Sequence, residues 1–324
     1  MTTSMLFALP AVWVACAVAG YLYSQQQGIP AWMFRAAIGA ILLEITFYYV
    51  MGVEALRARL ERLPPAGVGV LLILAAAAPY ILASFGFHTF RWSSLGWIVL
   101  LAGLASFWFI ALPKRPVFDL LFLAMAATVM LLRVFHPIYG SDPHPKLPLA
   151  SLGQLMWIRT CVFSMLSIRR VKGIGFGFWP KTREWKIGAT FFLLLIPVAA
   201  AIAWLIGFAR PHVPAGGWQK TSVLALATFF GILWVVALGE EFFFRGLLQQ
   251  WFGAWMRSEA AGLIAASVAF GAVHLWFRAF PNWRFALLAA VAGVFYGLAF
   301  RRARSIRASM VTHALVVTTW RVFF

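Results

Sequence analysis

Long apolar runs separated by short basic loops are the feature that most constrains how this chain can fold. A transmembrane helix needs about 20 mostly apolar residues, because the hydrocarbon core of a bilayer is about 30 Å thick. Eleven such segments lie near residues 5–24, 32–52, 66–88, 93–112, 117–135, 151–168, 187–209, 221–252, 260–277, 284–300 and 306–322. The sixth is interrupted by Gln154 and Arg159. We therefore expect an all-α, polytopic bundle of about 10–11 transmembrane helices.

The composition supports a membrane protein and argues against a nucleic-acid partner. Hydrophobic residues make up 63% of the chain and charged residues 11%, whereas soluble domains have about 45–50% and about 25%. The net charge of +18 does not indicate nucleic-acid binding, because Lys and Arg cluster between the apolar runs as in cytoplasmic loops of membrane proteins. The expected surroundings are a lipid bilayer.

The basic clusters also predict an orientation. They occupy even-numbered loops, at residues 57–62, 114–115, 169–186 and 301–307. Loops rich in Lys and Arg stay in the cytoplasm, so eleven spans place the N-terminus there too. The first segment lacks the basic stretch of a cleaved signal and is predicted to be retained. We expect an integral protein of the bacterial inner (cytoplasmic) membrane.

A loop with Gly, Pro and six basic residues, RRVKGIGFGFWPKTREWK, divides the chain near residue 186. Residues 1–186 hold few polar groups inside their apolar runs, and their role is not indicated. Glu44 in this part is expected to pair inside the bundle or to lie near a polar spot that faces lipid, with a carboxylate on a substrate path as the alternative. The chemistry-bearing side chains fall in residues 187–324.

The stretch VVALGEEFFFRGLLQQW, residues 235–251, places three charges inside an apolar run. Ionisable groups inside spans are costly and usually functional. Glu240 and Glu241 are neighbours, so on a helix they point about 100° apart. Glu241 and Arg245 are four residues apart and share a face. A guanidinium on that face can keep a carboxylate ionised in apolar surroundings, as a general base requires.

Two histidines lie in later apolar segments. His274 ends the sequence FGAVH, residues 270–274, and His313 lies in THALVV. At about 1.5 Å per residue, Glu240, His274 and His313 lie roughly 10–20 Å from the expected cytoplasmic ends of their helices. Three helices can therefore bring these groups to one level.

Two chemistries fit these residue types. Histidine and carboxylate are zinc ligands, but the usual His-Glu-x-x-His helix is absent. In metal-free hydrolysis, Glu240 and His274 would activate a water for attack on a peptide carbonyl, and His313 would stabilise the oxyanion. The second is favoured, with no metal and no other cofactor. A proton-coupled transporter is a further alternative, but no repeated halves are visible.

The three motifs resemble a known family. EEFFFR at 240–245 matches E-E-x-x-x-R, FGAVH matches F-x-x-x-H, and a histidine follows in the last span. This order is similar to that of the CAAX-protease and bacteriocin-processing family (CPBP, or Abi) of glutamic intramembrane proteases, which resemble the Ras-converting prenyl-protein endopeptidase. The resemblance covers roughly residues 187–324 and implies a protease core there.

The resemblance also implies roles. Glu240 would be the water-activating carboxylate, and His274 its catalytic partner. Glu241 and Arg245 would be the supporting pair, and His313 an oxyanion donor. The implied function is an integral-membrane endopeptidase, and the substrate is a membrane-associated protein or peptide that arrives laterally or from the cytoplasmic face.

One position departs from the family pattern. Val317 stands four residues after His313, where the family often has Asn or Asp, and valine cannot donate a hydrogen bond. Thr318, Thr319 or Asn282 would have to replace that donor. The alternative function is therefore a catalytically inactive scaffold or a bacteriocin-immunity protein of the same family.

The aromatic residues are expected mainly at the membrane surfaces. Trp and Tyr collect where lipid meets water, and the chain has 16 Trp and 7 Tyr. Trp276, Phe277, Trp283 and Phe285 follow His274 and are interpreted as such a belt, or alternatively as the lining of a substrate entrance.

Overall fold

The computed structural model describes residues 2–208 and 217–324. Within these residues every regular element is a helix and there is no β-strand. The predicted all-α fold is confirmed. Residue 209, the last of the predicted segment 187–209, lies outside the described residues.

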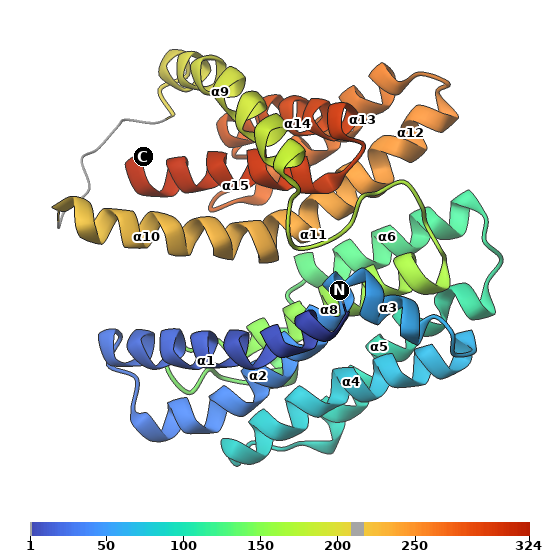
Figure 1. Ribbon diagram of the computed structural model, residues 1–324, viewed down its shortest axis with the longest axis vertical. Coiled ribbons are helices and arrows are strands. Elements are labelled where there is room, and N and C mark those ends of the chain that lie inside the picture. Colours follow the sequence, from blue (N-terminus) through green and yellow to red (C-terminus); the bar gives the residue numbers. More distant parts are fainter. Residues whose placement is uncertain (1, 209–216) are drawn as a thin grey trace. The chain divides into compact units, whose positions relative to one another are not determined.

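The chain divides into two compact units, Met1–Val171 and Lys172–Phe324 (Figure 1). Each unit has its own buried apolar core. The sequence-based division after residue 186 concerns the roles of the two parts, and it stays a prediction.

Unit 1 is built from helices that begin where the sequence offers a start signal. Pro65 and Pro116 occupy the first position of their helices, where the missing N–H of proline costs nothing. The elements are α1 (Thr2–Gln26), α2 (Ala31–Gly52), α3 (Glu54–Leu60), α4 (Pro65–Gly86), α5 (Trp92–Ala111), α6 (Pro116–Leu131), α7 (Phe135–Tyr139), α8 (Ala150–Phe163) and the π-helical turn η1 (Ser164–Ile168).

A buried ion pair ties α2 to α8. The guanidinium of Arg159 donates to both carboxylate oxygens of Glu44, at 2.7 and 3.2 Å, and to the carbonyl of Ala75 at 3.0 Å. Both charged side chains are buried. The interpretation of Glu44 as a paired residue is confirmed, and the same pair explains how Arg159 is accommodated inside an apolar helix.

Unit 2 contains one long helix and four others around it. The elements are α9 (Thr182–Leu205), α10 (Gly217–Gly231), η2 (Ile232–Ala237), α11 (Leu238–Glu241), η3 (Phe242–Gln249), α12 (Gln250–Trp255), α13 (Glu259–Val273), η4 (His274–Trp276), α14 (Trp283–Ala303) and α15 (Ile306–Phe323). The elements α10 to α12 form one continuous helix of 39 residues. Its turns η2 and η3 are π-helical, a wider winding that is frequent at functional sites.

By length and composition, seven of the described helices can cross a membrane. They are Ala31–Gly52, Pro65–Gly86, Trp92–Ala111, Thr182–Leu205, Gly217–Trp255, Glu259–Trp276 and Trp283–Ala303. The polytopic bundle is thus confirmed, whereas seven is fewer than the 10–11 spans expected from sequence. The other predicted segments are also helical, but α6 has only 16 residues and α15 carries several buried polar side chains.

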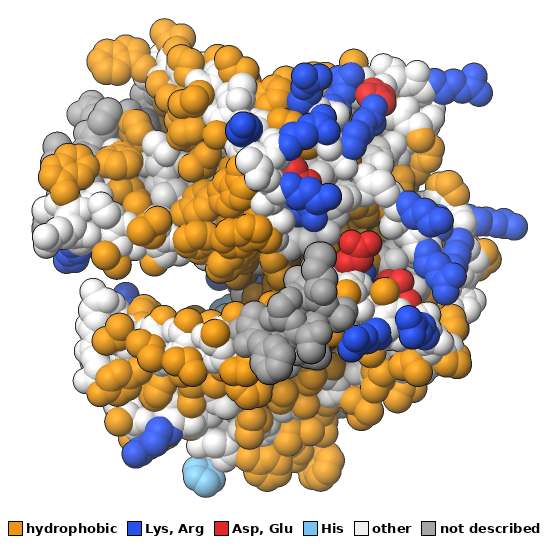
Figure 2. Space-filling model, in the orientation of Figure 1, with side chains coloured by type: hydrophobic (Ala, Val, Ile, Leu, Met, Phe, Trp, Pro, Cys, Tyr) orange, Lys and Arg blue, Asp and Glu red, His pale blue; other side chains and the backbone are white. Residues whose placement is uncertain are grey.

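Ion pairs hold one end of unit 2 together. Glu259 at the start of α13 binds Arg301 at 3.3 Å and Arg304 at 2.9 Å, where α14 ends. Glu184 in the first turn of α9 binds Arg307 in the first turn of α15 at 2.8 Å. The starts of α9, α13 and α15 and the end of α14 therefore meet, and we call this the basic end. Figure 2 shows Lys and Arg side chains gathered there, while much of the remaining surface in view is hydrophobic.

The predicted orientation can be tested with single cysteines at the two ends of α14. Arg284 and Arg302 are both exposed. In a Cys16→Ser background, we expect a membrane-impermeant maleimide to label Arg284→Cys in intact cells and Arg302→Cys only after permeabilisation, because the basic end is predicted to face the cytoplasm. The parent protein, which keeps the buried Cys161, should stay unlabelled. Labelling in the reverse order would contradict the orientation.

Candidate active site

A fully buried ion pair forms the base of the candidate site. Arg245 Nη1 donates to Glu241 Oε1 at 3.2 Å, and neither residue is exposed (0%). The second terminal nitrogen of Arg245 donates to the carbonyl of Gly293 on α14 at 3.1 Å. A Cβ atom at position 293 would lie 3.0 Å from that nitrogen, so glycine allows α14 to approach. The predicted shared face of Glu241 and Arg245 is confirmed.

Aromatic rings surround the guanidinium of Arg245. Its central carbon lies 4.5 Å from the ring centre of Phe270, 5.2 Å from that of Tyr296 and 5.7 Å from that of Phe244. The negative faces of such rings attract a cation, more strongly where water is excluded. These contacts offset part of the cost of taking the guanidinium out of water.

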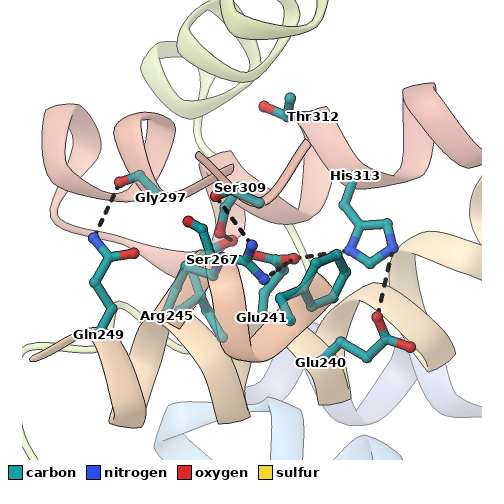
Figure 3. Close-up of polar contacts among 12 residues, drawn as sticks. Glu240, Glu241, Arg245, Gln249, Ser267, Gly297, Ser309, Thr312 and His313 are labelled. Atoms are coloured by element: carbon teal, nitrogen blue, oxygen red, sulfur yellow. Dashed lines mark hydrogen bonds and ion pairs between the residues drawn. The ribbon is translucent and has the colours of Figure 1, made fainter. Parts of the chain in front are cut away.

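His313 connects the buried pair to Glu240 (Figure 3). Its Nδ1 atom lies 2.8 Å from Glu241 Oε1, and its Nε2 atom lies 3.8 Å from Glu240 Oε2. An ionised carboxylate only accepts hydrogen bonds, so Nδ1 donates to Glu241, and Nε2 is the nitrogen on the side of Glu240. Tyr296 stacks on the imidazole with ring centres 4.7 Å apart, which fixes the plane of the ring.

Glu240 and Glu241 occupy different surroundings although they are adjacent in sequence. Glu241 is sealed into the ion pair, whereas 35% of the side-chain surface of Glu240 is exposed. The expected divergence of neighbouring helical side chains is confirmed. The structure therefore separates a carboxylate that can meet solvent from one that only holds other side chains.

The sequence suggested that His274 lies inside a helix. In the structure it lies just after the end of α13. Regular α-helix stops at Val273, and His274 begins the short turn η4. Its Nδ1 atom lies 2.7 Å from the carbonyl oxygen of Phe270. Because a carbonyl only accepts, Nδ1 donates this hydrogen bond, which leaves Nε2 as the acceptor whenever the ring is neutral.

One cavity joins three members of the site. It has a volume of about 880 Å³, and Glu240, His274 and His313 all line it, together with Phe270 and Tyr296. The rest of its wall is mainly apolar and comes from α9, α10, α14 and α15. Glu241 and Arg245 are not part of the wall. Three of the five predicted site residues thus line one cavity. The other two, Glu241 and Arg245, are buried next to it.

Val317 also lines this cavity, on the same helix as His313. Of the three residues considered as substitute donors, Thr319 lies in the wall. The hydroxyl of Thr318 is buried and has no hydrogen-bond partner among the described residues. Asn282 caps α14 by accepting from the backbone N–H of Phe285 at 3.2 Å. Thr319 is therefore the one of the three that can offer a hydroxyl to the cavity.

The aromatic residues after His274 divide between the two interpretations given for them. Phe277 and Phe285 line the cavity. Trp276 and Trp283 are largely exposed and do not line it, as expected for belt residues. The sequence offered these roles as alternatives for the whole cluster, and the structure divides the cluster between them.

The expectation that tyrosines lie at membrane surfaces is wrong for Tyr296, which is only 2% exposed. Sequence analysis missed this residue as part of the site. A signal was present, because Tyr296 lies between Gly293 and Gly297, which are four residues apart and share a helical face. Gly297 accepts from Gln249 at 3.2 Å, so this glycine face packs closely against η3.

The zinc alternative gains no support from the geometry. Among the described residues, no group of three or more His, Cys, Asp and Glu side chains is arranged to hold a metal ion. The hydrogen bond from His313 already occupies the inner oxygen of Glu241.

Comparison with known proteins finds a family match in the part of the chain that contains the candidate site. Residues 222–319 match the family model described as type II CAAX prenyl endopeptidase Rce1-like. The matched range includes Glu240, Glu241, Arg245, His274 and His313. No curated protein and no solved structure matches the chain. The resemblance inferred from the three motifs is confirmed.

The buried pair predicts a large difference between two arginine substitutions. Arg245→Gln leaves the carboxylate of Glu241 buried without its cation, and breaking such a pair costs about 3–5 kcal/mol of folding free energy. Arg301→Gln, the matched control, removes an exposed partner of Glu259 and should change stability little. The measurement is thermal unfolding of the purified protein in detergent. Equal losses in the two variants would contradict the importance given to the pair.

Proposed function

From the premise that residues 222–319 belong to the type II CAAX prenyl endopeptidase Rce1-like family, we propose that this chain is an endopeptidase of the bacterial inner membrane. It hydrolyses a peptide bond in a membrane-associated protein or peptide. Its catalytic core lies within residues 187–324. The observation that carries the proposal is the single cavity shared by Glu240, His274 and His313.

In this proposal, the carboxylate of Glu240 is the general base. It removes a proton from a water molecule as the water oxygen attacks the peptide carbonyl, and it later returns that proton to the leaving amine. The Nε2 atom of His274 is the second acceptor in the cavity, because its Nδ1 proton is committed to the carbonyl of Phe270. His274 therefore helps to hold and orient the water.

His313 stabilises the negative oxygen that forms during the attack. This role requires a proton on Nε2 as well as on Nδ1, and hence a positively charged ring. Glu241, 2.8 Å from Nδ1, stabilises that charge, as the buried carboxylate does in other catalytic triads. Arg245 keeps Glu241 ionised and in place. Glu241 and Arg245 thus act through His313 and do not touch the substrate.

The alternative function, an inactive scaffold or immunity protein of the same family, is favoured by one observation. Val317 presents an apolar side chain to the cavity at the position expected to carry a second hydrogen-bond donor. Loss of one oxyanion donor costs about 100- to 1,000-fold in turnover in other enzymes. The two functions differ in whether His313 and Thr319 are enough to stabilise the oxyanion without a further donor at position 317.

The catalytic assignment predicts the effect of conservative substitutions. Purified protein in liposomes would be incubated with membrane-anchored peptide substrates. We expect Glu240→Gln and His274→Ala each to lower turnover about 100-fold or more, the scale of general acid–base catalysis. The control Glu259→Gln makes the same chemical change at the basic end and should retain activity. Turnover should also survive a metal chelator. Undiminished cleavage by Glu240→Gln would rule out the mechanism.

A gain of activity should follow from restoring the missing donor. Val317→Asn places an amide in the cavity wall, and we expect turnover to rise about tenfold or more, because an added oxyanion donor acts on the transition state. Val317→Leu is the control without a donor. If wild type is inactive on every peptide and Val317→Asn is active, the chain is the inactive relative. If Val317→Asn changes nothing in an active enzyme, the oxyanion role of this wall is wrong.

A further inference from the structure

The exposure of the cavity wall changes from one end to the other. Around the candidate site the wall is buried, as Phe270 at 3% and Tyr296 at 2% exposed show. Farther along, the wall residues Trp204 and Phe277 are 80% and 45% exposed. These exposed residues lie near the end of α9 and just after α13. The cavity wall is therefore most buried around Phe270 and Tyr296, which we call its inner end, and most exposed at these helix ends, which we call its mouth.

The mouth lies at the end of unit 2 opposite the basic end. Ring contacts bring the end of α9, the start of α14 and the end of α15 together, since Phe208 lies 5.8 Å from Phe285 and 5.0 Å from Trp320. The basic end joins the other ends of these same three helices, as Glu184 and Arg307 show. In Figure 1 the C-terminus and the end of α9 lie on the same side of this unit.

Two arginines line the mouth. Arg278 and Arg321 are exposed and belong to the cavity wall. Neither has an ion pair or a side-chain hydrogen bond with any other described residue, although Arg278 lies over the ring of Phe277 at 5.4 Å. At the basic end, by contrast, Arg301, Arg304 and Arg307 bind carboxylates. Loops away from the cytoplasm are usually poor in arginine, so these two need a reason of their own.

The charges along the cavity define what can occupy it. Among the described residues that line the cavity, Glu240 is the only acidic one, and it lies at the inner end. Between it and the mouth the wall is apolar, with side chains such as Leu195, Ala203 and Leu288. A carboxylate is repelled near Glu240 and attracted at the mouth, where guanidinium groups bind carboxylates through paired hydrogen bonds.

Resting on the proposed function, we propose that Arg278 and Arg321 bind a carboxylate of the substrate peptide and thereby orient it. The apolar segment next to that carboxylate fills the cavity, and the scissile bond lies at Glu240. The acidic flank enters at the end opposite the basic end. With the predicted orientation, this is the outer side of the membrane, whereas the sequence led us to expect entry either laterally or from the cytoplasmic face. A lipid phosphate is the competing ligand for the two arginines. A lipid has no peptide bond for Glu240 and His274 to act on, so the peptide carboxylate is favoured.

Binding to an inactive variant tests this inference separately from catalysis. The probes are fluorescent peptides with an apolar Leu/Ala core and a flank of either Asp-Asp or Asn-Asn. Glu240→Gln protein in phosphatidylcholine vesicles should bind the Asp peptide about tenfold tighter, the scale of one charge-assisted hydrogen bond. Adding Arg278→Gln and Arg321→Gln should abolish the preference. Arg284→Gln, an exposed arginine at the same end outside the cavity wall, is the matched control and should keep it.

The outcomes separate the two proposals. A preference for the Asp peptide that survives loss of both Arg278 and Arg321 overturns the carboxylate site. So does loss of that preference when anionic phosphatidylglycerol replaces phosphatidylcholine, which would assign the arginines to a lipid phosphate. Wild type that binds with the expected preference but cleaves neither peptide counts against the endopeptidase and leaves the carboxylate site standing. If wild type and the arginine variants cleave both peptides equally, the endopeptidase stands and the carboxylate site is overturned.

Discussion

The buried bond between Glu241 and Arg245 is the interaction on which the candidate site depends. Taking both charges out of water costs several kcal/mol for each ion, and their attraction repays this only with good geometry and further hydrogen bonds. Unit 2 supplies these through the carbonyl of Gly293, the rings around the guanidinium and Nδ1 of His313. Gly293 lies on α14, Phe270 on α13 and His313 on α15, so the network that keeps the charges buried also ties three helices to the segment formed by α11 and η3.

The network leaves one face of His313 available for chemistry. Glu241 holds Nδ1 and Tyr296 holds the ring plane, so Nε2 is directed to the side of Glu240. A histidine held in this way loses little freedom when a substrate arrives, which is the physical basis of preorganised electrostatic catalysis. Apolar walls around it lower the local dielectric and strengthen each remaining charge interaction. In the proposed mechanism, the buried pair thus supports the reactivity of the residues that line the cavity.

Comparison with Glu44 and Arg159 shows what an ion pair alone provides. That pair is also buried and uses two hydrogen bonds, with a third from Arg159 to a backbone carbonyl. It satisfies both carboxylate oxygens of Glu44. In the pair of unit 2, Glu241 instead also accepts a hydrogen bond from the imidazole of His313, which lines a cavity. The chemistry proposed for unit 2 arises from this connection, since the residue types of the two pairs are the same.

The sequence by itself determined the helical fold and most members of the site. Apolar runs of bilayer length leave the backbone few ways other than a helix to satisfy its hydrogen bonds, and the spacing of Glu241 and Arg245 fixes their shared face whatever surrounds them. It also indicated the family through three ordered motifs. These features are local, because they depend on periodicity along one helix.

Tertiary structure decided what periodicity cannot express. It separated the buried Glu241 from the accessible Glu240, ended α13 at His274, and placed Tyr296 against His313 although tyrosine was expected at the membrane surface. It also placed the mouth of the cavity at the end of unit 2 opposite the basic end. Each of these results depends on which helices pack together and how closely, and that is set by side chains far apart in the sequence, such as Gly293 beneath Arg245.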